Sequence, residues 1–136
     1  MNHSTPDGST PHWASQYIGL PWVAGSSDCW SFARSVWREH FGWDVATVDV
    51  DAASRLQSLK AFDAHPEYEH WQMVEQPQEG DACLMGKSDR PSHIGVYLAA
   101  DGGGVLHSLE TAGVVFTPVA ALPSVGLRVL SWHRRR

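Results

Sequence analysis

Hydrophobic residues recur at helical spacing in residues 28–41. The apolar positions form one stripe: Cys29, Phe32, Ala33, Val36, Trp37 and Phe41. A Ser-Ser-Asp run ending at Asp28 can cap the start of such a helix, and Gly42 is placed to end it. We therefore predict a helix over residues 28–41, with Cys29 in its first turn and on its inward face.

The pattern after residue 50 is less regular. Residues 51–64 hold a weaker helical stripe that ends before Pro66. Short β-rich runs separated by turn residues follow, and they predict strands over residues 82–85, 94–99, 105–109, 114–117 and 127–132. Helices first and strands afterwards indicate an α+β fold with an antiparallel sheet.

Length and composition limit the remaining choices. The 136 residues suffice for one domain, which we assign to residues 13–136, after a flexible polar tail over residues 1–12. Residues 134–136 are all arginine, and we expect them to form a solvated tail. The net charge of −5 argues against nucleic-acid binding, and no apolar run is long enough to span a membrane. The polar start shows no secretory signal, so we expect a protein that is cytoplasmic as synthesised.

The two cysteines occupy positions with different chemistry. Cys29 falls at a predicted helix start, where the helix dipole and the first backbone N–H groups favour the nucleophilic thiolate. The alternative is that Cys29 is a small buried hydrophobe. Cys83 lies inside a predicted strand, and we expect a buried, inert thiol there. Neither the cysteines nor the histidines show the spacing of a metal site, so we predict no metal and no cofactor.

A thiolate nucleophile needs a base within hydrogen-bond reach. Of the eight histidines, His93 opens the predicted strand over residues 94–99 and His107 lies inside the predicted strand over residues 105–109. If the turn between these strands centres near Asp101, His107 pairs with Gly95, and His93 lies on the same face as Gly95. His93 and His107 then become diagonal neighbours with Cα atoms roughly 7–8 Å apart, and Gly95 leaves the space between them without a side chain. A base oriented by a second polar residue is the arrangement of a catalytic triad. The alternative is two unrelated, half-exposed histidines on one sheet face.

Four short motifs follow one another along the chain. Residues 19–32 contain a Gly-Leu-Pro-Trp run and then Gly-Ser-Ser-Asp-Cys-Trp-Ser-Phe, and residues 78–82 contain a Gly-Asp pair before a strand. Residues 92–98 read Ser-His-Ile-Gly-Val-Tyr-Leu, and residues 105–108 read Val-Leu-His-Ser. In order and spacing these resemble the nucleophile, strand-entry, histidine and third-polar-residue motifs of the NlpC/P60 family of cysteine peptidases. The resemblance covers roughly residues 17–132.

The resemblance implies a papain-like α+β fold, in which the nucleophile begins a helix packed on an antiparallel sheet. It also implies a cysteine peptidase with a Cys-His-His triad. Cys29 would attack an amide carbonyl, His93 would transfer the proton, and His107 would orient the imidazole. The substrate that the resemblance implies is a peptidoglycan stem peptide, cut between a D-γ-glutamyl residue and a diamino acid.

Three residues near the nucleophile bear on substrate binding. Asp28 matches an acidic residue that can recognise a substrate amine in members of this family, and its alternative role is to cap the helix. Trp22 stands where the family usually has tyrosine. Trp30 replaces a small residue after the nucleophile. We expect both tryptophans to line and reshape the substrate cleft.

Two other functions stay open at this point. One is a CHAP-like amidase on the same fold, and the other is a structural tail or assembly protein with a vestigial site. Lone domains similar to this chain occur in phage tails and among secreted antibacterial effectors. We therefore expect a phage-tail or secretion-apparatus protein as partner, with delivery to the periplasm or incorporation into a virion.

Overall fold

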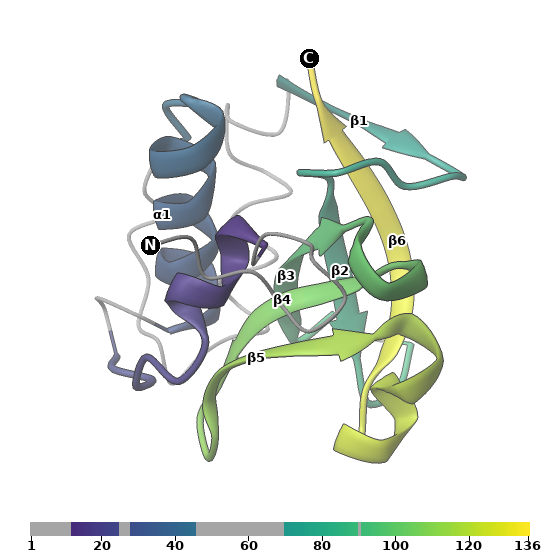
Figure 1. Cartoon of the computed structure of the whole chain (residues 1–136). Helices are drawn as coiled ribbons and strands as arrows, with labels where there is room; N and C mark the ends of the chain where they lie inside the picture. The colour runs from purple at the N-terminus through teal and green to yellow at the C-terminus, as the bar shows by residue number, and fades with distance from the viewer. Residues whose placement is uncertain (1–11, 25–27, 46–69, 90) are drawn as a thin grey trace.

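The structure is a computed structural model that describes residues 12–24, 28–45, 70–89 and 91–136. In chain order its elements, with η for a 3-10 helix, are η1 (Trp13–Tyr17), α1 (Cys29–Phe41), β1 (Trp71–Val74), β2 (Ala82–Gly86), β3 (His93–Leu98), η3 (Ala100–Gly102), β4 (Gly104–Leu109), β5 (Gly113–Pro118), η4 (Val119–Val125) and β6 (Arg128–Arg135) (Figure 1). The predicted helix over residues 51–64 lies outside the described residues, as do residues 1–11 of the predicted tail. Within the described ranges, no helix is both long and apolar enough to cross a membrane.

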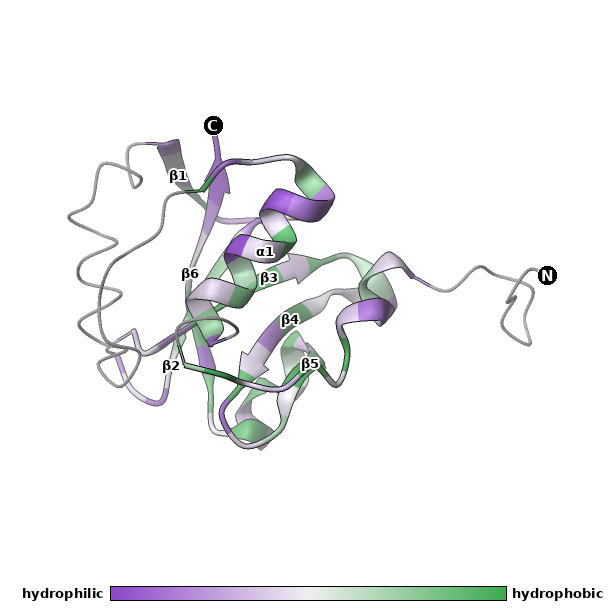
Figure 2. Ribbon diagram, turned by 90° about the vertical axis from the view of Figure 1, so that its left-hand side faces the viewer, coloured by the Kyte–Doolittle hydropathy of each residue, from purple (hydrophilic) through white to green (hydrophobic). Residues whose placement is uncertain are grey.

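In this part of the chain the strands form one antiparallel sheet of six strands, in the order β1-β6-β2-β3-β4-β5. Helix α1 packs against β3 and β4, and Figure 2 shows it beside these two strands. The predicted α+β class is confirmed, and the helix that starts at Cys29 lies on the strands that carry His93 and His107.

Local chemistry accounts for both ends of α1. The carboxylate of Asp28 accepts a hydrogen bond of 2.9 Å from the backbone N–H of Ser31, which is an N-cap. Gly42 ends the helix with a φ of 72°, in the left-handed conformation that glycine adopts without strain. Trp37 is fully buried, and its indole N–H donates to the carbonyl of Gly80 at 2.8 Å. This bond ties the helix to the turn before β2.

The sheet buries apolar side chains on both faces. Ile94, Val96 and Leu98 of β3 belong to the core cluster that also contains the buried face of α1. Cys83 and Met85 of β2 belong to a second cluster. Its other buried members are Val105, Leu122 of η4, and Leu127. A sheet packed on both faces is a rigid support for side chains at its ends.

The C-terminal arginines are not the solvated tail that the sequence predicts. They extend β6 through Arg135, and the strand pairs with β1, which the sequence analysis missed. Arg134 donates to the buried carboxylate of Asp81, with Nη2 and Oδ2 2.8 Å apart. Figure 2 shows this hydrophilic end of β6 in purple. A buried carboxylate needs a charged partner, and Asp81 finds it in Arg134 of β6. The polar sequence at this end of β6 hides the strand from a reading of the apolar pattern.

Candidate active site

Cys29 is the first residue of α1, and only 6% of its surface is exposed. The first helical backbone bond runs from the N–H of Phe32 to the carbonyl of Asp28, at 2.8 Å. The N–H groups of Cys29 and Trp30 precede this bond and sit at the positive end of the helix dipole. The position therefore has the electrostatics that favour a thiolate and a developing oxyanion.

His93 and His107 meet as the hairpin argument predicted. The β3–β4 ladder pairs Val96 with Leu106 and Tyr97 with Val105, and continuing this register sets His107 opposite Gly95. His93 Nε2 and His107 Nδ1 are 2.8 Å apart, so the two rings share a hydrogen bond. The alternative of two unrelated, half-exposed histidines is wrong, because both rings are buried.

The environment of His107 keeps its ring neutral. The side chain is fully buried, and desolvation lowers the pKa of His107 to about 4. A neutral imidazole has one N–H and one acceptor nitrogen. The acceptor nitrogen of His107 can therefore accept a hydrogen bond from an N–H of His93, while any positive charge stays on His93, and this is what an orienting residue does.

A third polar group, which the sequence analysis missed, completes this array. Thr117 Oγ1 lies 2.9 Å from His107 Nε2, and Thr117 is 7% exposed. The β4–β5 register pairs His107 with Val115, so Thr117 is its diagonal neighbour on the same face. The spacing of the next hairpin in the sequence, from β4 to β5, already sets Thr117 diagonal to His107.

The thiol and the histidines reach this region from different elements. Cys29 belongs to the same core cluster as Ile94 and Leu106, which are the chain neighbours of His93 and His107. Helix α1, which begins at Cys29, packs on β3 and β4, the two strands that hold the histidines.

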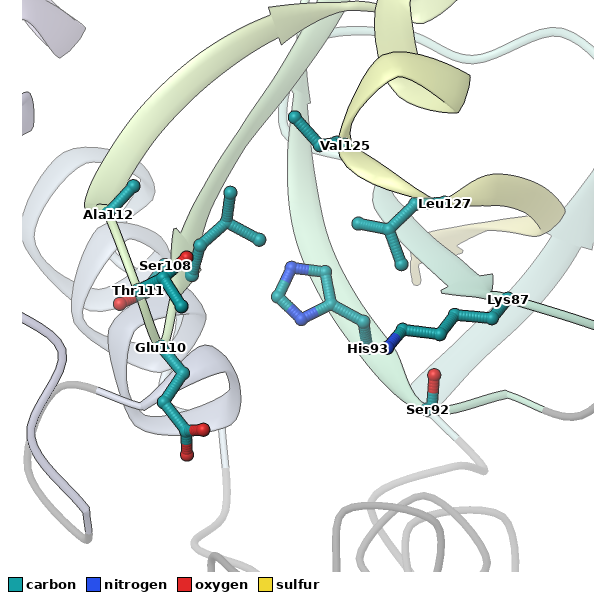
Figure 3. A pocket seen from close by; sticks show the side chains of 10 residues that line it. Lys87, Ser92, His93, Ser108, Glu110, Thr111, Ala112, Val125 and Leu127 are labelled. Atoms are coloured by element: carbon teal, nitrogen blue, oxygen red, sulfur yellow. The ribbon is translucent and has the colours of Figure 1, made fainter.

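A pocket of about 410 Å³ opens beside His93. Its lining residues are Lys87, Ser92, His93, Ser108, Leu109, Glu110, Thr111, Ala112, Val125 and Leu127. Figure 3 shows the His93 ring between the β4–β5 turn, which carries Glu110, and the side of the pocket that carries Lys87. One wall is apolar and the rim carries charges of both signs. The pocket therefore offers both apolar and charged groups to a ligand that lies beside the imidazole.

The other residues singled out from the sequence lie in different surroundings. Asp28 is buried and caps α1, so its capping role is observed. Trp30 is also buried in the core and packs edge-on against Trp37, with ring centroids 6.1 Å apart. Trp22 is half-buried. Cys83 is fully buried, and burial raises the pKa of its thiol far above the usual range, which fits the predicted inert thiol.

A family model and several solved structures match this chain. The profile of the NlpC/P60 family matches residues 8–123. Among solved structures, the chain is similar to the NlpC/p60 domain of the peptidoglycan hydrolase SagA, with a TM-score of 0.54 and 21% sequence identity over 90% of this chain and 92% of that one. At this identity the likeness shows the fold. No curated protein sequence matches the chain significantly.

Proposed function

This chain belongs to the NlpC/P60 family, and from that premise we propose that it is a cysteine peptidase that cleaves peptidoglycan stem peptides. Cys29 is the nucleophile, His93 the general base and acid, and His107 the residue that orients His93. The observation that carries the proposal is the buried hydrogen bond of 2.8 Å between the two rings, on strands packed by the helix that starts at Cys29.

The reaction follows from these positions. His93 takes the thiol proton, and the Cys29 thiolate attacks the amide carbonyl carbon. The backbone N–H groups at the start of α1 stabilise the resulting oxyanion. His93 then gives its proton to the leaving amine, which departs and leaves a thioester. Water, activated by the same imidazole, hydrolyses the thioester and restores the thiol.

The pocket supports a charged peptide as substrate. Lys87 and Glu110 line the same pocket as His93 and are exposed, so a peptide passing the imidazole can pair with both an ammonium and a carboxylate group. A stem peptide with a diamino acid after its D-γ-glutamyl residue carries groups of both signs. We propose the bond between these two residues as the site of cleavage. The SagA domain, named as part of a peptidoglycan hydrolase, has the same fold.

Digestion of purified muropeptides tests this proposal. Wild type, Cys29→Ala and the matched control Cys83→Ala are incubated with tripeptide and with intact wall, and the fragments are identified by mass spectrometry. We expect cleavage after the D-γ-glutamyl residue by wild type and Cys83→Ala, and none by Cys29→Ala. Release of the whole stem from the glycan would instead identify a CHAP-like amidase. No product with any wall peptide, although Cys29 reacts with iodoacetamide, would place the substrate outside the cell wall.

Asp28→Asn separates the two roles of Asp28. Asparagine caps helices as well as aspartate does, so the variant removes the charge and keeps the cap. If Asp28 pairs with the substrate's terminal amine, acetylating that amine costs about 2–3 kcal/mol, or roughly 30- to 150-fold in kcat/KM. In Asp28→Asn the acetylated and unacetylated peptides should be cut at similar rates. Equal cleavage of both peptides by wild type would leave Asp28 with the capping role alone.

A further inference from the structure

A buried hydroxyl extends the histidine pair to a third strand. Thr117 on β5 bonds His107 on β4, and His107 bonds His93 on β3. The two distances, 2.9 and 2.8 Å, are those of ordinary hydrogen bonds. All three side chains are buried, at 7%, 0% and 6% exposure respectively. Each proton in the chain must therefore be placed between protein atoms, because water has little access to it.

Only one placement of the protons lets His93 work as a base. His107 is neutral, since burial lowers its pKa to about 4, and so it carries one N–H. If that hydrogen is on Nε2, it is donated to Thr117, and Nδ1 accepts from the Nε2–H of His93. If it is on Nδ1, it is donated to His93, whose own hydrogen must then sit on its other nitrogen. In the second placement neutral His93 has no nitrogen left to receive the thiol proton.

We propose that Thr117 is a positioning residue that supplies the acceptor required by the productive tautomer of His107. The proposal rests on the proposed function of the Cys29–His93 site and deepens it. Without the hydroxyl, an N–H on His107 Nε2 would be buried without an acceptor, which is costly. The ring would then favour the Nδ1–H tautomer and reverse its hydrogen bond to His93. The hydroxyl also supports the imidazolium form of His93, because it keeps His107 Nδ1 as an acceptor.

A matched pair of variants isolates the hydroxyl. Thr117→Val keeps the shape and the strand preference of the residue but removes its oxygen. Thr117→Ser keeps the oxygen and removes a methyl group. Lys87 and Glu110, which line the pocket next to His93, and Cys29 are unchanged in both variants. A difference between Val and Ser at position 117 therefore reports the hydroxyl and not the surrounding charges.

The tautomer can be measured without any substrate. Two-bond 1H–15N spectra of protein labelled with 15N-histidine, recorded at pH 7, distinguish Nε2–H from Nδ1–H rings, and His107→Asn assigns the His107 signals. We expect Nε2–H for His107 in wild type and in Thr117→Ser, and Nδ1–H in Thr117→Val. A wild-type protein with Nδ1–H at His107 would overturn the proposal, whether or not any variant folds.

Kinetics supply the second readout. We expect Thr117→Val to lower kcat about 10-fold or more, to leave KM near the wild-type value, and to move the alkaline limb of the kcat/KM profile to lower pH. Thr117→Ser should retain the wild-type profile. If both variants keep the wild-type limb, or lose activity only in proportion to the unfolded fraction, Thr117 is merely structural. If wild type has the Nε2–H tautomer but cuts no peptide, the proposed function fails while the assignment of the tautomer holds.

Discussion

Gly95→Ala is the sharpest test of the geometry between the two histidines. A methyl group on Gly95 would overlap Val105 Cγ1, and it would lie 2.9 Å from His107 Cβ and 3.1 Å from the carbonyl oxygen of Leu106. The last two distances are shorter than ordinary van der Waals contacts of about 3.5–4.0 Å. Strand β3 would have to move away from β4 at the point where His93 meets His107.

The size of the expected loss in stability and in rate follows from this steric overlap. Overpacking of this kind costs about 1–3 kcal/mol of folding free energy, which for a chain of this length lowers Tm by about 4–10 °C. A shift of about 1 Å in the His93–His107 contact can lower the rate by about 100-fold. We therefore expect kcat to fall much further than the loss of stability alone would explain.

Gly42→Ala is the matched control. Gly42 ends α1, at the opposite end from Cys29, with a φ of +72° and nothing within 4 Å of an added Cβ. Alanine there costs about 1–2 kcal/mol through the left-handed backbone alone. Thermal unfolding and kcat on the tripeptide are measured for both variants at a temperature where both are folded. Equal kcat in the two variants would refute the requirement for a close His93–His107 contact.

Three further predictions concern the thiols and the histidines. Limiting iodoacetamide near pH 7 should label Cys29 and leave Cys83 unmodified in peptide mapping, because Cys83 is fully buried with a raised thiol pKa; preferential labelling of Cys83 would contradict the assignment. His93→Ala should abolish turnover, whereas His107→Asn should retain part of it and exceed His107→Gln, because the amide oxygen of asparagine falls nearest the place of His107 Nδ1. If both amide variants were as inactive as His93→Ala while folded, the two roles would need revision. Finally, burial lowers the pKa of His107 from 6.5 to about 4 in the folded protein. Between these two values the unfolded chain binds a proton that the folded protein does not. The free energy of unfolding is therefore unaffected by His107 above pH 6.5 and decreases as the pH falls from 6.5 towards 4. Urea unfolding should show a loss of about 2 kcal/mol at pH 5 from this group, and His107→Asn should remove that part of the pH dependence.

Elements with a strong local signal could be predicted from the sequence. The stripe that contains Phe32, Val36 and Trp37, with Asp28 and Gly42 at its ends, identified α1 within one residue. The turn around Asp101 determined the β3–β4 register and with it the His93–His107 contact. Both features depend on residues close together in the chain, where the helical period or the length of a hairpin leaves few alternatives.

Features that depend on contacts between distant segments could not be predicted from the sequence pattern. β1 has too little apolar pattern to be recognised, and its pairing with β6 depends on a partner some 60 residues away. Arg134 lies in a strand because its guanidinium pairs with the buried carboxylate of Asp81. Trp30 is buried because of the way α1 packs on the sheet.

By itself the sequence determined the α+β class, the helix that presents Cys29, and the pairing of His93 with His107. Only the tertiary structure decided which chemistry surrounds them. It buried His107 so that its ring is neutral, set Thr117 against it, and formed the pocket beside His93 from three separate parts of the chain. The physical reason is that local periodicity specifies which face a side chain occupies, whereas burial and hydrogen-bond partners depend on every segment packed against that face.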